Sequence, residues 1–159
     1  MGDMDISSRA EFAADPTQVF SMLTDEAFLR QVCEASGSLE SEVSASGDTT
    51  TTSRTLPAPD SAKKFTGATL TVIEKIVWGS AGADGARTGQ VTLSVPGQPV
   101  TMNGEVRLSP GGAGSTLDLT GVLKVNIPLV GKKLEQSAAP AVLAGFGKQQ
   151  EVGNSWLAA

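Results

Sequence analysis

The sequence predicts an α+β fold in which a curved antiparallel sheet packs against one long C-terminal helix. Three observations support this prediction. Segments that alternate apolar and polar residues recur between residues 4 and 125, separated by turns rich in Gly, Pro and Ser. Two short helical patterns follow the first of these segments, and a long helical pattern ends the chain. Strands joined by short turns pair as antiparallel hairpins, and helices grouped outside the strand-rich region are typical of the α+β class.

The first elements are predicted from alternation and from capping residues. Asp15 followed by Pro16 is a helix start, because Asp caps the backbone N–H groups and Pro fits the first helical position. Thr24 or Asp25 caps a second helix, which Gly37 ends. The expected elements are a strand over residues 4–12 and helices over residues 16–23 and 26–35.

Six further strands are predicted from period-two patterns and turn residues. The turn 47–48 joins the first two of them, and the Pro- and Gly-rich run 109–114 is expected to be the hairpin turn before the last. Residues 60–67, which include Lys63 and Lys64, are expected to form a loop. The expected strands cover residues 38–46, 49–56, 70–78, 87–95, 100–108 and 115–125.

The C-terminal helix is expected to begin at or just after Pro128, capped by Asn126, and to run to Trp156. Pro140 lies inside this helix and predicts a kink near residues 136–140, since it removes one backbone hydrogen bond. Three interior glycines each cost the helix about 1 kcal/mol relative to alanine. Either the sheet contacts tolerate them, or the small residues leave room for another group.

Composition limits the possible functions. The 159 residues predict a single domain, 1–159, with 40% hydrophobic residues but only 4% aromatic ones. The net charge of −5 argues against binding to nucleic acids and to an anionic membrane surface, and the lack of a long apolar run argues against stable insertion into a membrane. With one cysteine, no apolar run long enough to span a bilayer and no signal peptide in the pattern, a cytoplasmic protein is expected. The oligomeric state does not follow from the sequence.

The sequence lacks the residues that most enzymes use. It has no His and no Tyr, so the commonest general base and every Ser–His or Cys–His nucleophile are absent. One Cys without His cannot form a zinc site, so we predict no metal, no cofactor and no identified catalytic residue. Cys33 is interpreted as a buried structural residue on the apolar face of its helix. Lys63 and Lys64 are interpreted as solvated, or alternatively as a mouth that contacts an acidic head group.

Three stretches carry a resemblance to a known superfamily: residues 56–59 (Leu-Pro-Ala-Pro), residues 95–97 (Val-Pro-Gly) and, above all, residues 125–135, with Trp156 near the end of the helix. The chain resembles the START-like superfamily, also called SRPBCC, which includes lipid-transfer START domains, the birch-pollen allergen family and polyketide cyclases. Within it, the chain looks like an actinobacterial family of unknown function. The resemblance implies a helix-grip fold, in which a seven-stranded sheet encloses an apolar cavity beside the long helix.

Glu74 is the unusual residue of the strand over residues 70–78, because it shares a face with Leu70, Val72, Ile76 and Trp78. An inward carboxylate in an apolar row is costly unless it is paired. Two alternatives are therefore open: Glu74 points into the cavity, or a bulge or a place at the mouth exposes it to water.

The resulting hypothesis is an intracellular binding protein for a small hydrophobic or amphipathic ligand, lipid-like or polyketide-like. One alternative is a cyclase or hydratase with Glu74 as base, and another is an adaptor that uses the polar outer face of the sheet. The expected cavity residues are Leu70, Val72, Glu74, Val91, Leu93, Met102, Val106, Leu117, Leu119, Leu134, Ala138, Ala141, Val142 and Gly145.

Overall fold

The fold is seen in a computed structural model that describes residues 3–60 and 62–159. Seven strands and four helices follow one another in this part of the chain. The elements are β1 (Asp3–Phe12), α1 (Pro16–Leu23), α2 (Glu26–Ala35), β2 (Glu40–Ser46), β3 (Thr49–Pro57), α3 (Lys63–Thr66), β4 (Thr69–Trp78), β5 (Arg87–Ser94), β6 (Val100–Gly111), β7 (Gly114–Val125) and α4 (Gly131–Ala158).

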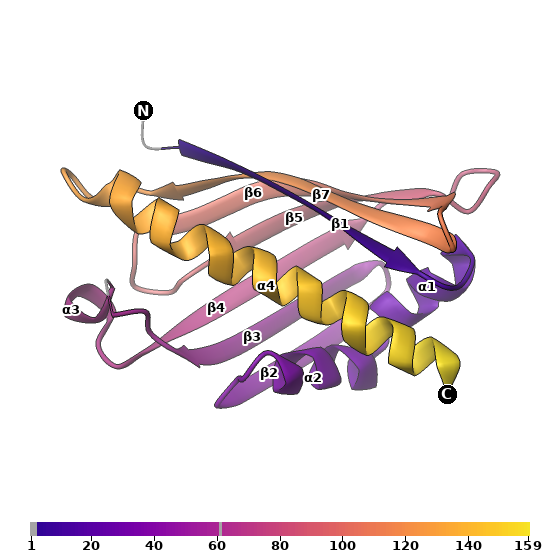
Figure 1. Ribbon diagram of the computed structural model, residues 1–159, viewed down its shortest axis with the longest axis horizontal. Helices are drawn as coiled ribbons and strands as arrows, with labels where there is room; N and C mark the ends of the chain where they lie inside the picture. Colours follow the sequence, from indigo (N-terminus) through magenta and orange to yellow (C-terminus); the bar gives the residue numbers. More distant parts are fainter. Residues whose placement is uncertain (1–2, 61) are drawn as a thin grey trace.

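The seven strands form one sheet in the order β1-β7-β6-β5-β4-β3-β2, and every neighbouring pair is antiparallel. The sheet curves around α4, which crosses its concave face from the α3 end to the α1 and α2 end (Figure 1). The predicted helix-grip arrangement is therefore confirmed. It arises because each strand presents one apolar face, and α4 covers that face.

The N-terminal capping predictions are confirmed in detail. The Asp15 carboxylate accepts a hydrogen bond of 2.8 Å from the Gln18 N–H, and Pro16 is the first residue of α1. The Asp25 carboxylate accepts a hydrogen bond of 2.8 Å from the Ala27 N–H at the start of α2. Both helices have the predicted bounds. A side-chain cap depends only on residues a few positions apart, so it can be identified from the sequence alone.

The C-terminal half of α4 packs tightly against the N-terminal strand. Gln150 Oε1 accepts a hydrogen bond of 2.8 Å from the Glu11 N–H, and the Asn154 side chain donates to the Glu11 carbonyl at 3.0 Å. A Cβ atom on Gly153 would lie 2.5 Å from the Phe12 ring, closer than atoms can approach. This glycine therefore allows the helix to approach the sheet, with the Phe12 ring lying where a side chain would otherwise stand.

Large aromatic side chains fill this end of the interior. Phe20 and Trp78 meet edge to face with ring centres 5.6 Å apart, and Phe28 and Trp156 do so at 5.7 Å. Phe12 is fully buried beside them. The opposite end, beside α3 and the start of α4, has Phe65 as its aromatic residue. Because aromatic rings are the largest core fillers, one half of the molecule is solid and the other has space left over.

The predicted start of α4 is wrong by three residues. The helix begins at Gly131, its cap position is Val130, and no side chain caps it, so Asn126 does not have the predicted role. Residues 128–130 form a turn in which Leu129 has a φ of 71°, a left-handed conformation that interrupts a helix. Pro128 therefore precedes the helix instead of opening it.

Helix α4 continues through Pro140 without a break. Pro140 is exposed, and so is Gln136, whose carbonyl loses its helical partner because proline has no N–H. Water can satisfy that carbonyl on the outer face of the helix. The structure therefore shows no interruption at the position for which a kink was predicted.

Two turns also differ from the prediction. The run expected as a six-residue turn is mostly strand: β6 extends to Gly111, β7 begins at Gly114, and the turn is reduced to residues 112–113. Gly112 has a φ of 54°, which suits so tight a turn. The expected loop over residues 60–67 contains the one-turn helix α3.

Candidate functional site

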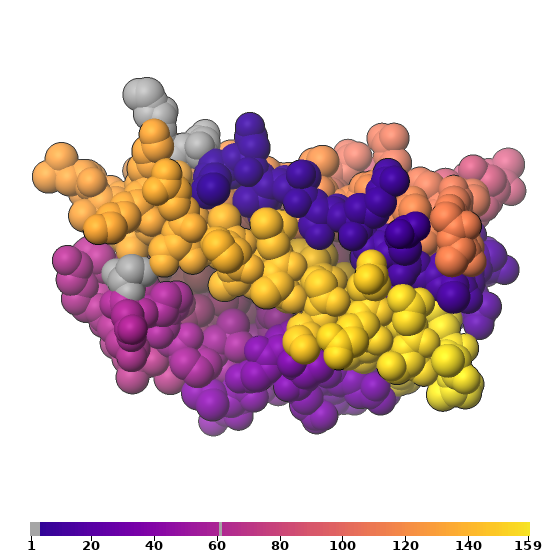
Figure 2. Space-filling view, viewed as in Figure 1, coloured from indigo at the N-terminus to yellow at the C-terminus, as the bar shows by residue number. Residues whose placement is uncertain are grey.

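The space between the N-terminal half of α4 and the sheet is a cavity of about 160 Å³. On the face of the molecule that carries α4, a recess beside the first half of the helix borders the segments near residues 50–70 (Figure 2). The lining is mostly aliphatic and is contributed by β3, β4, β5, β6, β7, α3 and α4. Its side chains include Leu56, Leu70, Val72, Leu93, Val95, Val100, Leu123, Leu134, Ala138 and Val142.

Nine of the fourteen expected cavity residues line this cavity or the pocket beside it. Leu70, Val72, Leu93, Leu134, Ala138, Ala141 and Val142 line the main cavity, and Glu74 and Gly145 line the adjoining pocket. The other five are buried core residues that line neither space: Val91, Met102, Val106, Leu117 and Leu119. These five point to the concave face as expected, but they pack within the hydrophobic core and leave no room there.

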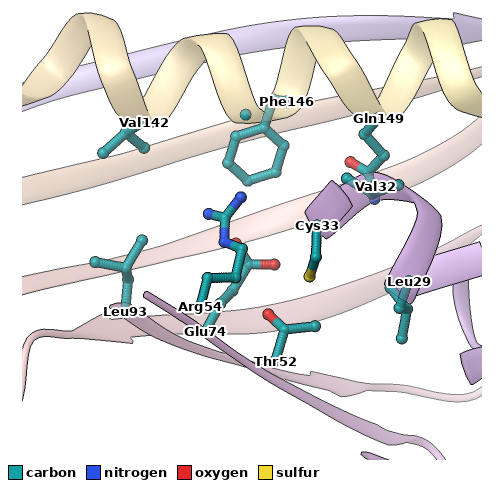
Figure 3. Close-up of a pocket in the computed structure, with 11 residues that line it drawn as sticks. Leu29, Val32, Cys33, Thr52, Arg54, Glu74, Leu93, Val142, Phe146 and Gln149 are labelled. Carbon is teal, nitrogen blue, oxygen red and sulfur yellow. The ribbon is translucent and has the colours of Figure 1, made fainter. Parts of the chain in front are cut away.

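A narrower pocket of about 40 Å³ adjoins the main cavity, with Arg54, Leu93 and Val142 shared between the two linings. Its polar residues come from three elements: Thr52 and Arg54 from β3, Glu74 from β4, and Gln149 from α4. Figure 3 shows the Arg54 side chain rising toward α4 between Val142 and Phe146, with Glu74 behind it. Glu74 thus points inward, and no bulge turns it out of the sheet.

The Arg54 guanidinium makes no hydrogen bond or ion pair within the described residues, although its charge acts on the nearby Glu74 carboxyl. Its Nε atom is buried without a hydrogen bond. Its Nη1 atom lies 3.5 Å from the position that a Cβ atom on Gly145 would occupy, so the group packs against the bare backbone of α4. A buried donor without a partner costs about 1–3 kcal/mol, and more when the group is charged. This arrangement is typical of a site that receives a ligand.

The buried position of Glu74 changes its acidity. Burial raises the pKa of the Glu74 carboxyl, and the positive charge of Arg54 opposes that rise without cancelling it. Glu74 remains partly accessible through the pocket that it lines. A carboxyl group in this state can donate a hydrogen bond when protonated and accept one when ionised.

Cys33 faces the same pocket from α2 but is 2% exposed. Burial raises the pKa of its thiol, which keeps it protonated and poorly nucleophilic. This fits the interpretation of Cys33 as a structural residue.

A surface hollow between α3 and the start of α4 is lined by Asp60, Lys64, Phe65, Val130, Lys133 and Leu134. It adjoins the main cavity, since Phe65 and Leu134 line both. Lys63 pairs with Asp60 at 2.9 Å, and the Lys64 ammonium lies 5.3 Å from the centre of the Phe65 ring. Lys63 and Lys64 are both exposed, as expected for a solvated pair. Phe65 also lines the cavity beneath them.

The structure adds two further observations on function. None of the helices in the described residues is long and apolar enough to cross a membrane. Residues 3–60 and 62–159 also contain no group of three or more His, Cys, Asp or Glu side chains that could hold a metal ion.

Comparison with known proteins places the chain in a family. Residues 7–157 match the profile of a family described as protein of unknown function DUF2505. The match spans nearly the whole chain, so the protein belongs to this family. No curated protein matches the sequence significantly.

Solved structures with the same fold have low sequence identity to this chain. TTHA0849 from Thermus thermophilus is 16% identical, with a TM-score of 0.63, and the match covers 96% of this chain and 94% of that one. A STAR-related lipid transfer protein from Xanthomonas axonopodis is 18% identical (TM-score 0.61; 98% and 86%). Norcoclaurine synthase from Thalictrum flavum, solved with dopamine and hydroxybenzaldehyde, is 14% identical (TM-score 0.60; 98% and 87%). These likenesses confirm the expected fold.

Proposed function

We propose that this protein is a binding protein for a small hydrophobic or amphipathic molecule, lipid-like or polyketide-like, held between the sheet and α4. The whole chain, 1–159, would serve as one container. The observation that carries the proposal is the aliphatic cavity of about 160 Å³ beside α4, in a domain whose other half is solid. Interiors are otherwise close-packed, and an apolar cavity of this kind stays dry unless an apolar ligand enters it.

The size of the cavity limits the ligand. A cavity of about 150 Å³ is known to hold one benzene molecule, while pockets for drug-sized ligands measure about 300–1,000 Å³. A single aliphatic chain of medium length or a one-ring compound therefore fits, with its end reaching the mouth. A lipid with two long chains does not fit in this state.

Native mass spectrometry of protein purified from its own host tests the proposal. We expect a species heavier than the protein by the mass of one small molecule. Organic extraction should then recover that molecule. A second test is the binding of toluene, a neutral one-ring probe, followed by saturation-transfer NMR on addition of purified protein. Protein that carries no extra mass and shows no toluene binding would contradict the proposal.

One observation favours a second candidate, a cyclase or hydratase. Glu74 is an inward carboxyl group with a raised pKa beside the cavity, which is a property of general bases in buried sites. Detection of a converted product, lost in Glu74→Gln but with ligand binding retained, would establish this function. A ligand recovered chemically unchanged after incubation with the protein would argue against it.

The remaining expectations have weaker support. A single cysteine fits a reducing compartment such as the cytoplasm. The resemblance alone supports an actinobacterial origin for the family.

For the adaptor alternative, the large exposed apolar side chains of the described residues lie on four separate segments, at Leu39, Val77, Val122 and Leu129. Scattered residues of this kind do not form the continuous patch that an interface needs.

A further inference from the structure

We propose that Arg54 and Glu74 form an acid-binding subsite, which holds the carboxylate of a ligand whose apolar chain occupies the main cavity. This inference rests on the function proposed above and specifies the class of ligand: a small carboxylic acid with a hydrophobic chain or ring.

The sheet register brings the two side chains to the same place. Arg54 of β3 pairs with Val72 of β4, and Thr52 pairs with Glu74. Arg54 and Glu74 are therefore diagonal neighbours on one face of an antiparallel pair, within reach of each other for long side chains. That face is the concave one, since Val72 and Leu93, the partner of Glu74 on β5, both line the cavity.

The unfilled hydrogen-bonding capacity of Arg54 indicates the ligand group. An arginine side chain stays protonated in proteins and presents five donors in a planar fork that matches a carboxylate. In the described residues, no ion pair or hydrogen bond reaches this guanidinium, and its Nε atom is buried. The guanidinium also lies where the two pockets join, so an acid group bound to it places its chain in the main cavity.

Glu74 can lie beside the bound ligand carboxylate because its own carboxyl group is easily protonated. The groups that face it are Arg54 from β3 and the Cys33 thiol from α2, while α4 and β5 contribute Val142, Phe146, Gln149 and Leu93, which do not titrate. A protonated Glu74 donates its O–H to the bound carboxylate, and Arg54 supplies the compensating positive charge. Where Glu74 is ionised before binding, the protein must take up a proton as the ligand binds.

The subsite discriminates among ligands with equal chains. An alcohol fills the cavity but leaves the guanidinium without a charged partner, and an amine brings a second positive charge beside it. We therefore expect decanoate to bind about tenfold or more tightly than decanol, because hydrogen bonds to charged groups are the stronger ones. Decylamine is expected to bind more weakly than either.

The experiment measures displacement of toluene by decanoate, decanol and decylamine with saturation-transfer NMR, followed by calorimetry of decanoate binding in buffers of different ionisation enthalpy. The variants are Arg54→Met, which keeps the length but removes the charge, and Arg54→Lys, which keeps the charge but not the fork. Arg107→Met is the matched control, because Arg107 is exposed on another strand and lines neither pocket.

Wild type and Arg107→Met should prefer decanoate about tenfold. At a pH where Glu74 is ionised in the free protein, both should take up a proton on binding. Arg54→Met should lose the preference for the acid, and Arg54→Lys should keep part of it. Equal affinities for decanoate and decanol in the wild type would overturn the acid-binding subsite while leaving the container in place. Failure of the wild type to bind toluene or any of the three chains would overturn both proposals.

Discussion

Glu135 of α4 accepts a hydrogen bond of 2.9 Å from the backbone N–H of Val125, the last residue of β7. The Glu135 side chain is 1% exposed, although its sequence neighbours Lys132 and Lys133 are exposed. A Cβ atom on Gly131 would overlap the Val125 carbonyl, so the first turn of the helix lies directly on the end of the strand. This contact fixes the start of α4, where Leu134 lines the cavity.

Replacement of Glu135 by Ala should lower the free energy of unfolding by about 1–3 kcal/mol, because it leaves the buried N–H of Val125 without an acceptor. Urea unfolding followed by circular dichroism measures the change. Glu135→Gln retains an acceptor and should cost less. Lys132→Ala, at an exposed position in the same turn, is the control and should change stability by no more than about 0.5 kcal/mol. An equal effect of Glu135→Ala and Lys132→Ala would show that the contact adds little.

The glycines of α4 provide a second matched pair. Gly153→Ala should destabilise the protein by about 1–3 kcal/mol, since the new methyl group overlaps the Phe12 ring. Gly147→Ala meets no atom within 4 Å and should instead stabilise the helix by about 0.5–1 kcal/mol. Thermal unfolding of both variants would show shifts of opposite sign. Stabilisation by Gly153→Ala would mean that α4 does not lie as close to β1 as described.

Most of the fold follows from local signals in the sequence. Side-chain caps define the starts of α1 and α2, and alternation defines the strands to within a few residues. The start of α4 was missed because it depends on a tertiary contact. Glu135 reads as a polar surface residue in a helical pattern, and only the meeting of α4 with β7 makes it a buried anchor. The left-handed turn at Leu129 has no Gly or Asn, the residues that would indicate this conformation in the sequence.

The candidate site was predicted in part. Period-two alternation identifies which residues face inward but not how far along the helix the space lies, so Val91 and Met102 were expected in the cavity and are instead in the solid core. Arg54 was missed although a signal existed. It shares a face with Leu56, the apolar residue of a strand otherwise rich in Thr and Ser, and that pairing predicts an inward side chain.

Filling the cavity should separate ligand binding from stability. Ala138 lines the cavity, so Ala138→Phe should abolish toluene uptake while the protein stays folded. Ala144→Phe adds the same ring on the exposed face of the same helix and should leave uptake unchanged. The measurements are saturation-transfer NMR and circular dichroism. If Ala138→Phe instead costs the 1–3 kcal/mol or so typical of overpacking, and the wild type takes up no toluene, the interior is solid.

The stability of the protein should depend on pH through Glu74. Because burial raises the pKa of this carboxyl in the folded state, the folded protein binds more protons than the unfolded chain between the unfolded pKa, about 4.5, and the raised folded value. The contribution of the Glu74 carboxyl to the free energy of unfolding is therefore fully present below the unfolded pKa and is lost as the pH rises through the folded pKa. Glu74→Gln cannot ionise, so this contribution does not change with pH in the variant.

Urea unfolding of wild type and Glu74→Gln at a series of pH values tests this sign. The variant should gain stability relative to the wild type as the pH rises from acid to neutral, and the difference should then level off above the folded pKa. Glu42→Gln, on the exposed edge strand β2, should show no such trend. A loss of stability in Glu74→Gln that grows toward neutral pH would have the opposite meaning: Glu74 would then be ionised and held in a favourable pair with Arg54, and the guanidinium would not be open to a ligand carboxylate.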